Sequence, residues 1–191
     1  MPHKRAVAIC DSLKREMEVL LAEREKGEYE LITFPGQCHK AGKMDCSLFC
    51  ANAQQNFQRF DTVEIFNSGC FAHPADPSPQ CRHCFKHFEQ LCFYMLADRT
   101  MVDTLMASGA YLVTPGWLRH WQQYMVEWGL DQETAAMLFG ETTNRIVLLD
   151  TGVFPESGRM LEEFAGFVQL PFERVAIGLG FFRAYVNGHL H

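Results

Sequence analysis

The chain has 191 residues, of which 48% are hydrophobic and 21% charged, so it is not a disordered, collagen-like or coiled-coil protein. Its length predicts a single compact domain over residues 1–191. The net charge of -6 gives no electrostatic reason to bind nucleic acid or an anionic membrane. No apolar run approaches the ~20 residues of a membrane span, and charged residues interrupt the N-terminal segment where a secretory signal would lie, so we expect a cytoplasmic protein.

Apolar runs bounded by turn residues predict strands, and apolar residues at helical spacing predict helices between them. The first run is followed by Asp11 and Ser12, either of which can cap the next helix. The predicted strands are 5–10, 29–34, 62–66, 110–114 and 145–150. The predicted helices are 13–21, 46–60, 84–97, 101–108, 118–128, 132–138, 156–167 and 181–186, with a short segment at 174–177 between the last two.

This alternation predicts an α/β fold in which helices flank a mostly parallel sheet in Rossmann-like layers. The run 145–150 is the most continuous apolar segment, which is typical of a central parallel strand. The alternative to one continuous layered sheet is a pair of loosely similar lobes, Arg5 to Cys70 and Ala110 to Ile177. A cysteine-rich insertion at about 38–92 falls within the first half.

Residues with chemical capacity come directly after the predicted strands. The carboxyl ends of parallel strands form one edge of a sheet, and ligands bind in the crevice at that edge. We therefore expect these residues to share one edge of one mainly parallel sheet. They are Cys10, Cys38 with His39, Cys70, Thr114 and Asp150.

Asp150 and His39 are the candidate catalytic residues. Asp150 can act as a general base or bind a cation, and it can equally well cap the turn that follows. Thr114 and Trp117 are candidate cofactor contacts because they flank a strand-ending Pro-Gly, although the spacing of the tryptophans is also typical of a core. Gly69 is a third cofactor candidate, because it lets the backbone turn toward a bound group without a Cβ clash.

The eight cysteines favour metal or redox chemistry, because a reducing cytosol disfavours a disulfide framework. Two thiolates separated by two residues can share one ion, since a tight turn brings the sulfurs to the roughly 3.5–4 Å edge of a metal tetrahedron. Cys81 and Cys84 have this spacing, and Cys46 and Cys50 form a looser pair. The alternative for such residues is surface thiols. For Cys10 and for Cys92, which fits a helical pattern, the alternative is a small buried hydrophobic side chain.

The sharpest expectation is one centre that contains Cys70, Cys81 and Cys84 and is completed by Cys38 or Cys10. Prolines between residues 73 and 79 stiffen the segment that brings Cys81 and Cys84 back. The predicted helix from residue 84 would point its amide dipoles at the thiolates and favour their ionised, metal-bound form.

Several motifs resemble the protein family called domain of unknown function 1638 over nearly the whole chain. They are Ala8-Ile-Cys10, Gln37-Cys-His39, Asn67-Ser-Gly-Cys70, Thr114-Pro-Gly-Trp117, Asp150-Thr-Gly152 and Phe181-Phe-Arg-Ala-Tyr-Val-Asn-Gly188. The resemblance implies an α/β fold and site residues at Cys10, His39, Cys70 and the stretch Arg82-His83-Cys84. It also implies a setting of anaerobic one-carbon and corrinoid methyltransferase metabolism. The family has no settled activity, and this chain lacks the Asp of the family's Arg-x-His-Asp-Cys stretch while adding Cys38, Cys46, Cys50 and Cys81.

Two functions follow as hypotheses. The first is a metalloprotein with an iron-sulfur cluster or zinc, acting in one-carbon, methyl or electron transfer on a small-molecule substrate or with a redox or methyltransferase partner protein. A cluster is favoured because seven cysteines outside the helical pattern exceed what one zinc can use. The second is a non-enzymatic ligand or redox sensor, with heme or corrinoid held by His39 or His87 among the many phenylalanines.

Overall fold

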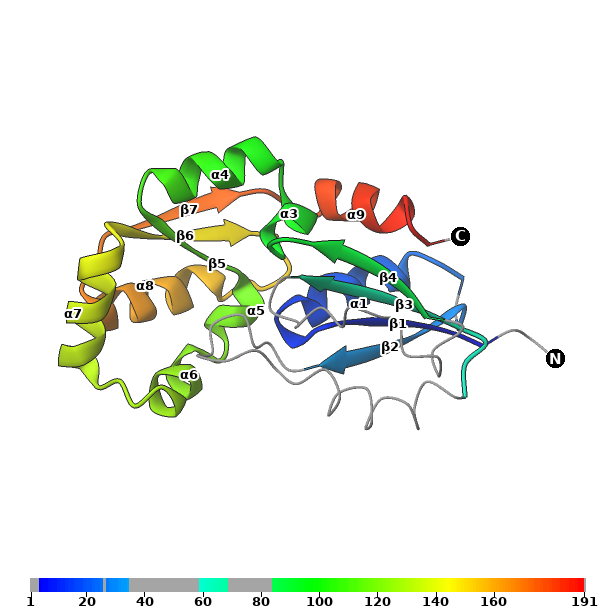
Figure 1. Cartoon of the computed structure of the whole chain (residues 1–191), viewed down its shortest axis with the longest axis horizontal. Helices are drawn as coiled ribbons and strands as arrows, with labels where there is room; N and C mark the ends of the chain where they lie inside the picture. The colour runs from blue at the N-terminus through cyan, green and yellow to red at the C-terminus, as the bar shows by residue number, and fades with distance from the viewer. Residues whose placement is uncertain (1–3, 26, 35–58, 69–83, 191) are drawn as a thin grey trace. The chain divides into compact units, whose positions relative to one another are not determined.

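The computed structural model describes residues 4–25, 27–34, 59–68 and 84–190 (Figure 1). The chain forms two compact units, which we describe separately: unit 1 is Met1–Met95 with Tyr185–His191, and unit 2 is Leu96–Ala184. Each unit contains a parallel sheet flanked by helices, which confirms the predicted α/β fold. None of the described helices is both long enough and apolar enough to span a membrane.

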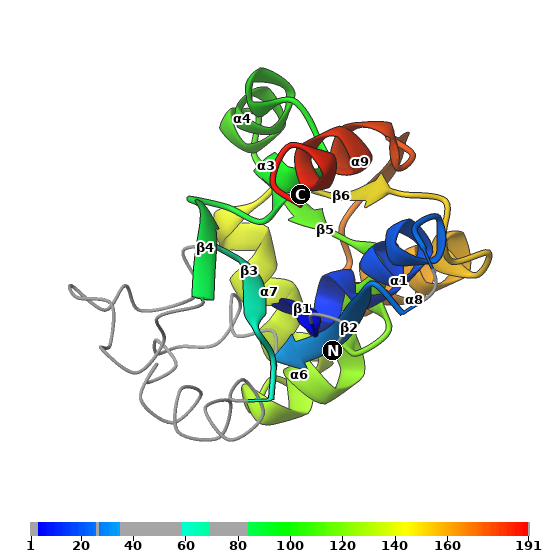
Figure 2. The ribbon, with the colours of Figure 1, turned by 90° about the vertical axis from the view of Figure 1, so that its right-hand side faces the viewer.

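Unit 1 is built on a four-stranded sheet of order β2-β1-β3-β4, with every neighbouring pair parallel. The strands are β1 (Arg5–Cys10), β2 (Tyr29–Phe34), β3 (Thr62–Ser68) and β4 (Cys84–Glu89). The turn η1 (Asp11–Leu13) and helix α1 (Lys14–Ala22) follow β1. Helix α1 lies along one face of this sheet (Figures 1 and 2). The parallel arrangement places the ends of β1, β2 and β3 at the same edge.

Strand alternation divides the side chains of β1 and β3 between two faces of the sheet. One face carries a buried cluster made of Ala6, Ala8, Cys10, Phe34, Phe60, Val63 and Ile65. Val7, Ile9 and Phe66 occupy the alternate positions and are completely buried. Strand β1 is therefore covered on both faces, which explains its continuous apolar sequence.

The helix predicted for residues 84–97 is wrong, because residues 84–89 form strand β4. These residues pair with β3 from Val63↔Cys84 to Ser68↔Glu89. Aromatic residues such as Phe85 and Phe88 favour strands. The backbone N–H and C=O groups of this segment form their hydrogen bonds with β3 instead of within a helix. The helix α3 begins only at Phe93 and ends at Leu96. Cys92 lies before it and is half-buried, so its predicted place inside a buried helix is also wrong.

Unit 2 is built on a three-stranded parallel sheet of order β5-β6-β7. The central strand is β6 (Arg145–Asp150), as its apolar run predicts. The other strands are β5 (Ala110–Val113) and β7 (Phe172–Ala176). The helices are α4 (Arg99–Ala107), α5 (Pro115–Leu118), α6 (Trp121–Glu127), α7 (Gln132–Thr142), α8 (Ser157–Val168) and α9 (Gly180–Asn187), whose last residues belong to unit 1.

Two sheets are present where the sequence predicts one. Strand β5 pairs with β6, and β4 is the last strand of the first sheet, so the described strands form no continuous seven-stranded sheet. The expectation that Cys10, Thr114 and Asp150 share an edge of one sheet is therefore wrong, because strand pairing is a long-range choice that local sequence does not encode. The two predicted lobes contain β1–β3 and β5–β7, respectively. The single domain over residues 1–191 stays a prediction.

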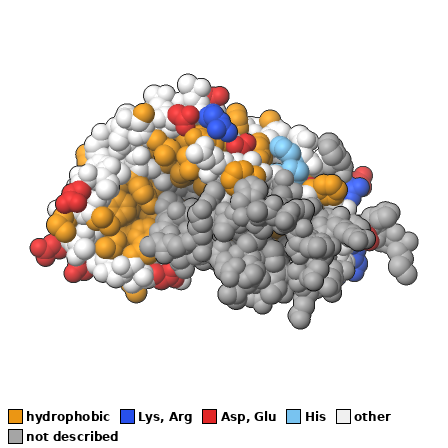
Figure 3. Space-filling model, in the orientation of Figure 1, with side chains coloured by type: hydrophobic (Ala, Val, Ile, Leu, Met, Phe, Trp, Pro, Cys, Tyr) orange, Lys and Arg blue, Asp and Glu red, His pale blue; other side chains and the backbone are white. Residues whose placement is uncertain are grey.

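Aromatic side chains form the core of unit 2. The ring of Phe164 in α8 lies 5.0 Å from Trp117, 5.6 Å from Trp121 and 5.6 Å from Phe139, measured between ring centroids. Such tilted and edge-to-face pairs are the favoured aromatic geometries. Other large hydrophobic residues of unit 2 are exposed, including Val126, Met137 and Leu138. Figure 3 shows hydrophobic side chains gathered on the visible surface of unit 2.

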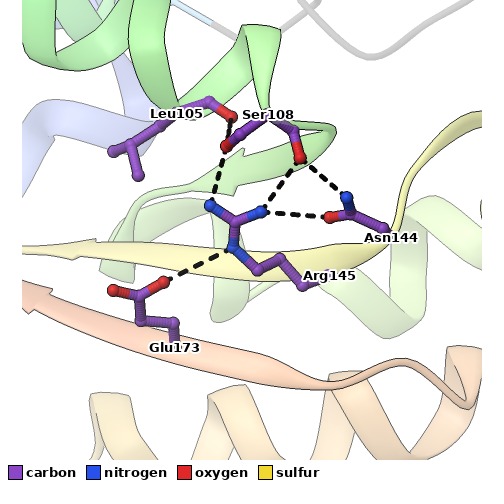
Figure 4. Close-up of polar contacts among 5 residues, drawn as sticks. All are labelled: Leu105, Ser108, Asn144, Arg145 and Glu173. Atoms are coloured by element: carbon purple, nitrogen blue, oxygen red, sulfur yellow. Dashed lines mark hydrogen bonds and ion pairs between the residues drawn. The ribbon is translucent and has the colours of Figure 1, made fainter.

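A polar network fixes the turn between α4 and β5 (Figure 4). Arg145 donates to the Ser108 carbonyl (3.0 Å) and to its hydroxyl (2.8 Å), and it also pairs with Glu173 (3.4 Å). Asn144 donates through Nδ2 to the same carbonyl at 2.7 Å. Between them, Gly109 has a φ of +82°, and a Cβ there would lie 2.7 Å from Asn144 Nδ2. The turn thus requires glycine for both its conformation and its space.

We expect Gly109→Ala to lower the free energy of unfolding by about 2–3 kcal/mol, because it adds a backbone strain and displaces the Asn144 amide. Gly129→Ala is the matched control, since Gly129 also has a positive φ (+69°) but nothing within 4 Å of its Cβ position. The control should lose only about 1 kcal/mol. Urea denaturation of both variants measures the difference, and equal losses would contradict the role given to Asn144.

Candidate functional site

The carboxyl edge of the first sheet brings Cys10 next to Asn67. Cys10 pairs with Phe34 at the end of β2, and Ile9 pairs with Phe66 on the other side. Continuing that register by one residue places Cys10 beside Asn67, and alternation puts both on the same face. The Cys10 side chain is buried at 8% exposure. A thiol, an amide and the following Ser12 thus gather where three parallel strands end.

Two buried polar atoms at this edge have no hydrogen-bond partner among the described residues: Ser12 Oγ and Asn67 Oδ1. Ser12 is only 5% exposed. Most buried polar groups in proteins are paired, and leaving one unpaired costs about 1–3 kcal/mol. The described residues therefore do not supply the partners that these two atoms require.

Several residues that the sequence assigns to the site lie outside the described part of the chain. They are Cys38, His39, Cys46, Cys50, Gly69, Cys70 and Cys81. In the sequence, Cys38 follows the end of β2 by four residues and Cys70 follows the end of β3 by two. Within the described ranges, no three histidine, cysteine or carboxylate side chains converge as metal ligands.

Cys84 begins β4 and lies at the amino edge of the sheet. It pairs with Val63, which pairs with Ala6, so four residues of strand separate its level from that of Cys10. This is about 13 Å along the strand direction, in addition to two strand spacings across the sheet. Thiolates on one metal lie roughly 3.5–4 Å apart. The version of the predicted centre that contains both Cys10 and Cys84 is therefore wrong, and no helix dipole starts at Cys84.

Thr114 and Trp117 have structural roles at the end of β5. The Thr114 hydroxyl accepts a hydrogen bond of 3.2 Å from the Trp117 amide and so caps α5, in which Pro115 takes the first position. Trp117 is 2% exposed and packs against Tyr111, Tyr124 and Phe164. The tryptophan spacing therefore reports core packing, which is the alternative that the sequence left open for this residue.

Asp150, at the end of β6, organises two loops of unit 2. Its buried Oδ1 accepts from the Gly152 amide at 2.9 Å and from the Ser157 hydroxyl at 3.4 Å. Its Oδ2 accepts from the guanidinium of Arg174 on β7. The Asp150 carbonyl also accepts from Ile177 N at 2.9 Å. These contacts join the loop after β6 to the loop after β7.

The contacts of Asp150 fit a structural anchor better than a general base, since both carboxylate oxygens already accept hydrogen bonds. Asp150 remains a catalytic candidate only together with Arg174, whose side chain is 56% exposed at the same edge. The sequence does not point to Arg174, because an arginine on a short polar strand looks like an ordinary surface residue. Only the pairing of Val175 with Leu149 places it beside Asp150.

These features define an α/β protein with polar and thiol groups at the carboxyl edges of two parallel sheets. Residues 9–186 match the family described as Protein of unknown function (DUF1638), and the chain belongs to that family. Neither the curated proteins nor the solved structures gave a match.

Replacing Asp150 with Asn tests its anchoring role. We expect Asp150→Asn to lower the free energy of unfolding by about 2–3 kcal/mol, because the amide removes the charge that Arg174 faces and can place an N–H group against another donor. Glu173→Gln on β7, next to Arg174, is the control and should cost less than about 1 kcal/mol, since its ion pair is exposed. Chemical denaturation followed by tryptophan fluorescence measures both, and an unchanged Asp150→Asn stability would refute the anchor.

Proposed function

We propose that this protein is a thiolate-ligated metalloprotein whose centre is held at the carboxyl edge of the four-stranded sheet by Cys10, Cys38 and Cys70. The carrying observation is the order β2-β1-β3, in which three adjacent parallel strands end at one edge. Cys10 is the last residue of β1, and in the sequence Cys38 comes four residues after the end of β2 and Cys70 two residues after the end of β3. Cys46, Cys50, Cys81 and His39 are the candidates for a fourth ligand.

The groups around Cys10 fit a sulfur-rich centre. The Ser12 hydroxyl can donate a hydrogen bond to a thiolate or to inorganic sulfide, and the Asn67 amide can do so through Nδ2 after a half-turn of the side chain. Hydrogen bonds to sulfur are a main means by which proteins tune iron-sulfur centres. The unpaired Ser12 hydroxyl is thus a donor of the kind that such a centre uses, whereas the unpaired Asn67 Oδ1 is an acceptor and fits only with the amide reversed.

We favour an iron-sulfur cluster over zinc because the chain has more cysteines than one zinc can use. When bound, a cluster would supply electron transfer or an open iron position for substrate. The proposed role is one-carbon, methyl or electron transfer with a small-molecule substrate or a redox or methyltransferase partner. Cys10 would bind the centre, while Ser12 and Asn67 would orient it and adjust its reduction potential.

Metal content after anaerobic purification tests the ligand set. We expect Cys10→Ser and Cys70→Ser to lower iron and acid-labile sulfide severalfold, because each removes a thiolate. Cys84→Ser and Cys92→Ser are matched controls, since Cys84 lies at the opposite edge and Cys92 precedes α3. Equal metal in all four variants would contradict the proposal, as would a wild-type protein without metal. A Soret band would instead support heme binding and the sensor hypothesis.

Replacing Ser12 with Ala tests whether its hydroxyl faces the centre. If it donates to sulfur, Ser12→Ala should retain the metal but shift the visible spectrum and the reduction potential. If it has no bound partner, the variant should be unchanged in both and more stable by about 1 kcal/mol, since an unpaired buried hydroxyl is removed. Anaerobic redox titration and thermal unfolding of the same sample distinguish these outcomes.

A further inference from the structure

Helix α7 of unit 2 exposes two large apolar side chains next to each other. Of its 11 residues, only Ala135 and Phe139 are buried. Met137 is 62% exposed and Leu138 is 44% exposed. Figure 3 shows acidic side chains close to the exposed hydrophobic surface of unit 2. Large apolar side chains that are exposed together, with polar residues around them, are typical of a surface that binds another molecule.

Two glutamates border Met137 along the helix. Glu133 comes four residues before it and Glu141 four residues after it, and residues four apart are neighbours on a helix surface. Both glutamates are exposed, and the carboxylate of neither forms an ion pair or a hydrogen bond with a described residue. The sequence over 120–144 contains no lysine or arginine. This face of α7 therefore combines apolar side chains with negative charge that no described residue neutralises.

Gly140 lies on the same face as Met137, three residues further along α7. A glycine inside a helix lowers the stability of the helix, because it has more backbone freedom to lose on folding. The described structure does not require glycine here, since its φ is not positive and a Cβ would have no atom within 4 Å. The missing side chain instead leaves room for a second helix to approach α7 closely beside Met137.

We propose that this face of α7 binds an amphipathic helix of a partner protein, with an apolar stripe that is edged by lysine or arginine. The apolar stripe would cover Met137 and Leu138, and the basic residues would pair with Glu133 and Glu141. The two glutamates are about 12 Å apart along the helix axis, so a single partner helix of ordinary length spans both.

The charge of this face argues against other occupants. If a second copy of the chain packed antiparallel about Met137, Glu133 of each copy would approach Glu141 of the other, and like charges repel. The same two carboxylates would repel an anionic membrane surface. The proposal goes beyond the thiolate centre, which would be held by residues of unit 1, so each proposal can fail without the other.

Binding of a labelled synthetic peptide to the full-length protein, followed by fluorescence anisotropy, tests this surface. The probe is a helix-forming peptide with leucines at positions i, i+3, i+4 and i+7 and lysines on both sides of them. A second peptide has glutamate in place of every lysine. The lysine peptide should bind saturably and about tenfold or more tightly than the glutamate peptide, and its affinity should fall as salt is added.

Variants of α7 locate the binding surface. Met137→Gln should weaken binding about tenfold, because it removes apolar surface but keeps a good helix former. Met106→Gln is the matched control, since Met106 is an exposed methionine of α4. Glu141→Gln should reduce the salt dependence of binding, whereas Glu162→Gln on α8 should not. Gly140→Ala should raise the thermal unfolding midpoint and still weaken binding, a combination that a folding defect does not produce.

Three results would overturn the proposal. The first is equal binding of the lysine and glutamate peptides, and the second is equal affinity of the lysine peptide for the wild type and Met137→Gln. The third is a wild-type dimer that Met137→Gln converts to a monomer in analytical ultracentrifugation, which would assign this face to a second copy of the chain. None of these measurements requires a metal in the protein, so their outcome does not depend on the thiolate centre.

Discussion

The buried ladder that joins β1 to β2 and β3 is the constraint on which the architecture of unit 1 depends. Residues 6–9 of β1 are completely buried, and both neighbours are parallel to it. A shift of one residue would send every side chain of β1 to the other face and expose the core, so the register is strongly specified. This register, together with strand alternation, places Cys10 beside Asn67.

Alternation also gives the two faces of this sheet different side chains. Cys10 and Asn67 occupy one face, and His87 with Phe66 occupies the other. Thiolates suit soft ions, so the proposed centre belongs to the face that carries Cys10.

Unit 2 shows how a chemically capable residue can be used for structure. Asp150 follows an apolar strand, which is a common position for a catalytic acid or base, but its oxygens accept from Gly152, Ser157 and Arg174. At the opposite end of β6, Arg145 also has a structural role, because it holds the turn between α4 and β5 through the Ser108 carbonyl. The charged residues at both ends of β6 thus hold neighbouring loops in place. The cysteines of unit 1 are therefore a stronger indication of a functional site than Asp150.

The sequence by itself determined the α/β class, the strands at the start of the chain and around residues 110–114 and 145–150, and most helices of unit 2. These elements have apolar periods and turn residues that act locally. Only the tertiary structure decided that residues 84–89 form a strand, that the strands divide into two sheets and that Cys84 lies far from Cys10. All three outcomes depend on which strands, distant in the sequence, form hydrogen bonds with each other at the edge of a sheet. Strand pairing is long-range, and local sequence preferences yield to it when backbone groups must be satisfied.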